Sequence, residues 1–257
     1  MSAVADRTLE NETQALLDEF CQAVSDDLQL LARLHAKELD EAILGTLKRS
    51  GFPRCLGLRL TSEGSEEVLA HLQETVEAWP ETPDSRLLDL LAADFAAIYL
   101  NNSLGASPQE SFWLDDEHLV MQRQMFQVRE IYERHGLEVE NWRTCADDHL
   151  VNELEFLARV IAGEGVQDIR EVARFLDEHL LRWLDSFAIR IAGRCDTPFY
   201  AGLAMLTSLY CEELRNLLAL ILDEPRPSAE EIEERMAEKP EPIAVPLQYV
   251  PGVSPSW

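Results

Sequence analysis

The chain has 257 residues, of which 46% are hydrophobic, so it can bury an ordinary core. It carries 48 acidic against 22 basic side chains, a formal net charge of −26, which repels phosphate backbones and argues against nucleic acid as a partner. Such a surface attracts basic partners and speeds their approach. The alternative interpretation is plain solubility, because runs of charge usually form a solvated face.

Apolar residues recur at three- and four-residue steps through most of the chain, which is the period of one helix face. The first stretch is Leu17–Leu34, and the second is Met121–Tyr132, with Gly136 where a C′ glycine ends a helix. No sustained alternation with hairpin turns occurs. The sequence therefore predicts an all-α fold of roughly six to nine helices. Three further stretches complete the pattern: Leu150–Ile161, Val172–Ile191 and Phe199–Ile221.

Residues 1–222 are expected to form a single globular multi-helix domain. Thr197 and Pro198 supply an N-cap and a first position for its last helix. Seven of the 12 prolines lie in residues 223–257, which are also acidic, and proline at this density favours extended chain. We expect an acidic, proline-rich, partly extended tail with one short helix near Ala229–Met236. Its end, Val245–Trp257, has enough apolar residues to fold back onto the body.

The chain shows no sign of membrane insertion or secretion. Its longest run without a charged residue, Thr197–Cys211, has 15 residues, whereas a spanning helix needs roughly 20 apolar residues. The first residues lack a basic segment followed by an apolar one, so we expect no secretory signal. Five cysteines without a Cys-x-x-Cys pair are typical of reduced thiols. We therefore expect a cytoplasmic protein with no transmembrane segment.

No motif for catalysis or for a bound cofactor occurs. The sequence contains neither GxSxG, GxxxxGK[ST], GxGxxG nor HxxxH. His149 and Glu153 share a helix face and could supply two metal ligands, but a metal site needs more. We therefore expect no metal, no cofactor and no catalytic residue.

Two segments have the composition of a docking surface. Residues 91–117 join an apolar helix to a proline-containing loop that ends in Phe112 and Trp113, and because these are adjacent, at least one is expected to line a surface groove. Phe95 and Tyr99, at helical spacing, are expected in the core. Residues 146–157 open with Asp147, Asp148 and His149. These three either cap a helix or grip a cationic peptide.

Four blocks in this order resemble the TorD/DmsD family of redox-enzyme maturation chaperones, over roughly residues 30–222. The family's proline before Asp148 is missing here, and Ser103 stands where some relatives have a bulky aromatic residue. The matching blocks are Leu30–Leu39; Ala93–Phe95 with Tyr99, Leu100, Pro108 and Ser111–Asp115; Cys145–Leu150 with Glu153, Leu154 and Leu157; and Phe175–Phe187 with Phe199–Leu203.

The resemblance implies a cytoplasmic chaperone without catalysis. Such a chaperone binds the twin-arginine signal peptide or the apo form of a molybdopterin-containing oxidoreductase, and it assists cofactor insertion before export or assembly. The resemblance also allows a homodimer formed by helix exchange. Aromatic side chains would take the apolar part of the peptide and Asp148 would pair with its arginines. The implied peptide-binding residues are Phe95, Tyr99, Pro108, Ser111, Trp113, Asp148 and His149.

Two other functions stay open at this point. One is a general helical adaptor whose acidic surface binds a basic protein partner without reading a signal sequence. The other is a hydrolase that uses His149 and Asp148 with a third, unidentified group.

Overall fold

The computed structural model describes residues 2–163 and 165–237, with the backbone alone for residues 2–10. Within these residues the regular structure is helical, with eleven α-helices and no strand, so the predicted all-α class is confirmed. The count exceeds the predicted range partly because short helices such as α5 carry too little periodicity to be found. The α-helices are α1 (Ser2–Ala36), α2 (Glu41–Ser50), α3 (Ser65–Glu77), α4 (Ser85–Phe95), α5 (Glu110–Leu114), α6 (Arg123–Arg134), α7 (Leu150–Ile161), α8 (Val166–Glu178), α9 (Leu184–Ala192), α10 (Pro198–Leu222) and α11 (Ala229–Met236).

Several predicted helices match the structure closely. α7 has the predicted bounds, and α10 begins at Pro198 after the N-cap Thr197. α6 ends as predicted, because Gly136 adopts a left-handed conformation with a φ of +67°. Its start lies two residues after Met121, whose own φ of +58° is incompatible with the helix.

The predicted stretch Val172–Ile191 is not one helix. α8 ends at Glu178, a 3₁₀ turn covers Leu180–Arg182, and α9 follows. The break lies at His179, whose φ of −126° and ψ of −85° are not helical. Apolar spacing did not reveal the break because the side chains on both sides of it remain buried in the same core.

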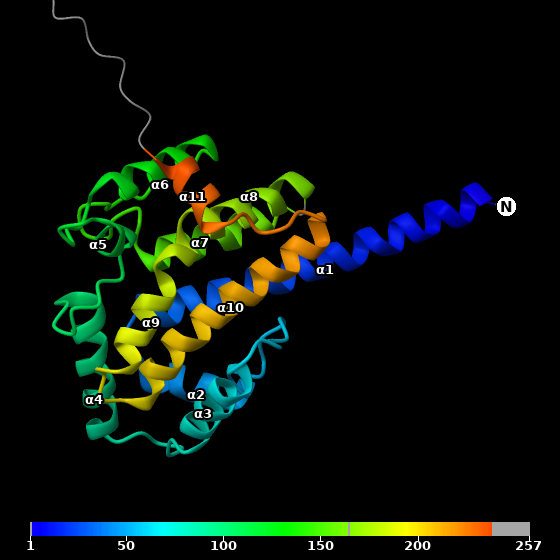
Figure 1. Ribbon diagram of the computed structural model, residues 1–257. Coiled ribbons are helices and arrows are strands. Elements are labelled where there is room, and N and C mark those ends of the chain that lie inside the picture. Colours follow the sequence, from blue (N-terminus) through cyan, green and yellow to red (C-terminus); the bar gives the residue numbers. More distant parts are fainter. Residues whose placement is uncertain (1, 164, 238–257) are drawn as a thin grey trace, which may run out of the picture. The chain divides into compact units, whose positions relative to one another are not determined.

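The helices pack in two groups that share one hydrophobic core. α7 lies along α1, and α10 contacts α3, α8 and α9 (Figure 1). α1 and α10 are joined by polar bonds, since the Tyr210 hydroxyl donates to Asp27 Oδ2 at 3.0 Å. α10 approaches α3 at Gly202, where a Cβ would lie 2.6 Å from Leu72 Cγ.

The chain divides into two compact units, Met1–Arg226 and Pro227–Trp257. In the second unit the predicted short helix is confirmed as α11. Ser228 caps it through a bond from Glu231 N, and the Glu231 side chain accepts from Ser228 N in return. The predicted return of Val245–Trp257 to the body lies outside the described residues. Among the described residues no helix has both the length and the apolar character that crossing a membrane requires.

Replacing Gly202 with alanine should destabilise the fold, although alanine is the better helix former by about 1 kcal/mol. The new methyl group would overlap Leu72, and overpacking of a core typically costs about 1–3 kcal/mol. Urea denaturation measures the loss. The matched control is Gly193→Ala, whose Cβ would meet Ile189 O at 3.5 Å and Arg190 O at 4.0 Å, both ordinary contacts. Equal stability of the two variants would show that α3 and α10 are not in close contact.

Candidate functional site

Two predicted segments meet in a backbone clamp between the Pro108–Ser111 loop and the start of α7. Glu110 N donates to Asp148 O at 2.9 Å, and Leu150 N donates to Pro108 O at 2.8 Å. These bonds form an isolated antiparallel bridge between Gln109 and His149. The clamp fixes the aromatic loop against the first turn of α7.

The Asp148 side chain strengthens this clamp. Its Oδ2 accepts bonds from both the backbone N–H (2.8 Å) and the hydroxyl of Ser111. Asp148 therefore caps α5 from across the loop rather than its own helix. The carboxylate is fully buried, so in this structure it is not available to a peptide arginine.

The N-cap of α7 is His149 and not Asp147 or Asp148. The Nδ1 atom of His149 accepts a hydrogen bond from Val151 N at 3.2 Å. This bond requires a neutral ring nitrogen, and burial lowers the pKa of His149 to about 4. Asp147 is also buried and pairs with Arg129 of α6 at 2.7 Å.

Trp113 is held at the edge of the body by three contacts. Its Nε1 donates to Ser107 O at 2.8 Å, its ring meets Phe187 edge to face, and the Arg190 guanidinium lies 4.3 Å over it. Arg190 also donates to Gly105 O at 2.7 Å, which ties α9 to the same loop. Trp113 and its neighbour Phe112 are both half-buried, and the groove expected there stays a prediction.

Phe95, at the end of α4, and Tyr99, in the π-helical turn Ala96–Leu100 that follows it, have tilted rings 4.8 Å apart. Tyr99 lies 2.6 Å from Nδ1 of buried His35, whose Nε2 lies 2.8 Å from the Thr207 hydroxyl. Because Thr207 gives its own proton to Leu203 O, His35 donates through Nε2 and accepts from Tyr99. The ring is thus neutral, and burial followed by nearby His149 lowers the pKa of His35 to about 3.

Sequence reasoning missed a buried set of acidic groups beneath the clamp. Glu110 and Glu153 are fully buried, and His179 Nδ1 donates to Glu110 at 3.0 Å. Neither oxygen of Glu153, nor Oδ1 of Asp148, has a hydrogen-bond partner among the described residues. No local sequence pattern indicates that these groups meet, because Glu110, Glu153 and His179 come from three separate parts of the chain.

The protonation of these acids follows from their burial. Burial raises the pKa of Asp148 from 3.8 to about 6, although its bonds from Ser111 oppose the rise. The pKa of Glu153 is raised well above its ordinary value by burial and then by the charges of Glu110 and Asp148. Burial therefore favours the protonated form of Glu153.

The structure thus brings Pro108, Ser111, Asp148 and His149 together in the clamp, with Trp113 on the same loop. Tyr99 instead pairs with His35 of α1. Within the described residues, no group of three or more His, Cys, Asp and Glu side chains could hold a metal ion. Asp148 bonds Ser111 while His149 bonds the α7 backbone, so these residues do not form the acid–base pair of a hydrolase.

Comparison with known proteins points to one family. A family model described as nitrate reductase delta subunit matches residues 59–188. A chaperone protein TorD of Vibrio cholerae serotype O1 is 24% identical over 202 residues, 76% of this chain and 91% of the relative. Those of Photobacterium profundum (26% over 166 residues, 61% and 75%) and Vibrio vulnificus (31% over 130 residues, 47% and 60%) are also similar. The family match includes both sides of the clamp.

Asp148→Asn should change how stability depends on pH. The folded pKa of about 6 exceeds the ordinary 3.8, so the contribution of Asp148 is fully present below pH 3.8 and is lost as pH rises through 6. An amide keeps acceptors for Ser111 but does not titrate. Relative to wild type, the variant should therefore gain up to about 3 kcal/mol between pH 4 and pH 7.5.

Urea denaturation at several pH values measures this difference. Asp89→Asn, at an exposed position on α4, is the control and should follow the wild-type pH dependence. A stability difference between Asp148→Asn and wild type that is constant across the range would contradict a buried, proton-binding Asp148.

Proposed function

The chain belongs to the nitrate reductase delta subunit family, and we propose that it is a chaperone that binds the twin-arginine signal peptide of a molybdopterin-containing oxidoreductase. The predicted membership of the TorD/DmsD group is confirmed at the level of the family. In this proposal the chaperone acts in the cytoplasm, holds the apo enzyme and assists cofactor insertion before export or assembly. Exchange of helices between two copies stays a prediction.

The clamp is the observation that carries this proposal. It joins Ser111 to Asp148, which lie 37 residues apart, and so holds a half-buried tryptophan and a helix N-terminus in one fixed arrangement. A rigid aromatic side chain presented by a fixed loop costs little conformational entropy when a peptide binds. Peptide recognition by an apolar groove uses this kind of anchor.

The seven predicted residues take two roles in the proposal. Tyr99, Trp113 and His149 are half-buried and would contact the peptide. Ile189, 58% exposed and adjacent to Arg190 over the Trp113 ring, extends the apolar surface. The other four predicted residues are buried and would position the contact residues. These four are Phe95, Pro108, Ser111 and Asp148.

The other functions have less support. The bonds of Asp148 and His149 do not suit acid–base catalysis, and the relatives are named chaperones. A general adaptor is compatible with the net charge of −26. An adaptor would need only an acidic surface. The clamp in addition fixes an aromatic side chain next to a helix N-terminus, which an adaptor would not require.

Trp113→Ala should weaken binding of a synthetic peptide with two adjacent arginines and a following apolar run by at least about 1 kcal/mol. The loss is expected because the substitution removes the aromatic anchor, and isothermal titration calorimetry measures it. Leu220→Ala, an exposed apolar position on α10, is the control and should bind normally. If Trp113→Ala binds the peptide as tightly as wild type, the peptide does not bind at Trp113. If wild type does not bind the peptide, the proposed function is refuted.

Replacing both peptide arginines by lysine separates a signal reader from an adaptor. Lysine keeps the charge but loses the planar fork of donors that pairs with carboxylates. A signal reader should bind the lysine peptide about tenfold more weakly. Equal affinity for both peptides at the same salt concentration would favour the adaptor.

A further inference from the structure

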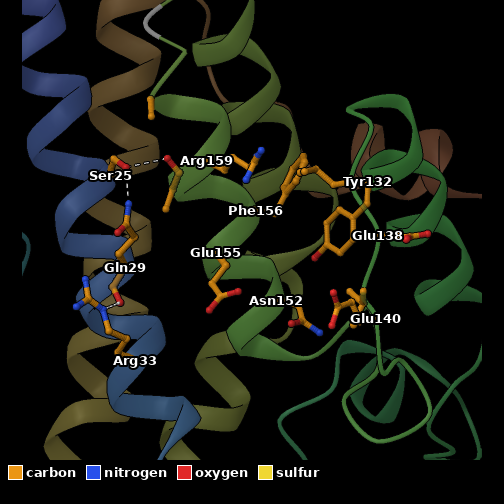
Figure 2. Close-up of a pocket in the computed structure, with 14 residues that line it drawn as sticks. Ser25, Gln29, Arg33, Tyr132, Glu138, Glu140, Asn152, Glu155, Phe156 and Arg159 are labelled. Atoms are coloured by element: carbon orange, nitrogen blue, oxygen red, sulfur yellow. Dashed lines mark hydrogen bonds between the residues drawn. The ribbon is translucent and has the colours of Figure 1, made fainter.

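A cavity of about 810 Å³ opens between α1, α7 and residues 137–140, the connection that follows α6 (Figure 2). It is separate from the clamp but starts close to it, because His149 caps α7 and Asn152 of the first turn already lines the cavity. Its volume lies in the range of about 300–1,000 Å³ that ligand sites occupy. It is large enough for a short stretch of extended chain but not for a folded domain.

Three carboxylates line this cavity without a partner. Glu138 and Glu140 come from the connection and Glu155 from α7 (Figure 2). All three are exposed, and none has an ion pair or a hydrogen bond within the described part of the chain. Some acids elsewhere find partners, as in the 2.7 Å pair between Glu224 and Arg170. The cavity therefore presents unused negative charge.

Two arginines supply the donors of the same cavity. Arg33 of α1 donates only to Gln29 O, at 3.3 Å, and Arg159 of α7 has no bond within the described residues. Each guanidinium carries five N–H donors. Because neither guanidinium forms an ion pair within the described residues, their remaining N–H donors can bind backbone carbonyl groups of a peptide.

Apolar side chains complete the lining. Phe156 and Tyr132 are each 3% exposed, and their tilted rings lie 4.9 Å apart, so they form a rigid surface. Leu137 and Val139 of the connection are half-buried beside them. An apolar side chain of a bound peptide can be buried there next to the carboxylates.

We infer that this cavity holds the basic stretch of the client peptide in an extended conformation, an inference that rests on the proposed function. Glu138, Glu140 and Glu155 would bind the arginine side chains through charge-assisted hydrogen bonds. Arg33 and Arg159 would bind the peptide carbonyls. The cavity thereby takes the role that sequence reasoning gave to Asp148, whose carboxylate is buried and already bonded to Ser111.

The test uses the full chain and a fluorescent synthetic peptide with two adjacent arginines followed by an apolar run. The cavity variant is Glu138→Gln/Glu140→Gln/Glu155→Gln. The control is Glu63→Gln/Glu67→Gln/Glu74→Gln, which removes the same charge from exposed positions in or near α3, outside this cavity. Fluorescence anisotropy at low salt gives the affinities, and circular dichroism checks that each variant is folded.

The cavity variant should bind at least about tenfold more weakly, and the control within about twofold of wild type. If both variants lose affinity equally, the charge acts only at long range and the inference is overturned. If wild type binds but the cavity variant is unaffected, the inference is overturned while the proposed function stands. If wild type does not bind at all, the proposed function fails and the inference fails with it.

Discussion

The pairing of the Pro108–Ser111 loop with the first residues of α7 is the interaction on which the site depends. Two backbone bonds and the Asp148 carboxylate join segments that are 37 residues apart. The pairing sets the N-cap of α7 against the loop, and Trp113 beyond the loop is held in addition by Ser107, Phe187 and Arg190.

Acidic residues serve two different purposes in this protein. One set is buried and organises backbone groups: Asp27 accepts from Gly57 N and Leu58 N, and Asp94 accepts from Asp196 N and Thr197 N. The other set is exposed and unpaired, as along the cavity beside α7. The net charge of −26 counts buried and exposed acids alike. Only the exposed acids can contact a basic partner.

Much of the fold was predictable because apolar spacing reports directly which helix face is buried. That signal correctly located α7 and α10. It failed at His179, since one non-helical residue breaks a helix without changing the spacing of its apolar neighbours. It also missed α5, whose five residues are fewer than two turns.

The site was predictable in part. The motif residues on both sides of the clamp were identified, but the direction of the Asp148 side chain was not. Asp before a helix usually caps that helix, whereas here the carboxylate caps α5 and His149 takes the N-cap. The cavity beside α7 is formed by residues far apart in the sequence, from Arg33 to Arg159, and no local pattern indicates that they line one space.

Amide hydrogen exchange of the free chain, followed residue by residue, tests the clamp most directly. If the pairing exists, the amides of Glu110, Ser111 and Leu150 exchange slowly, as bonded helix amides do, although two of them lie at the end of a loop. Exchange of these three amides as fast as that of an open loop would show that the two segments are not joined. The loop and α7 would then not hold Trp113 and His149 in the arrangement proposed for peptide binding.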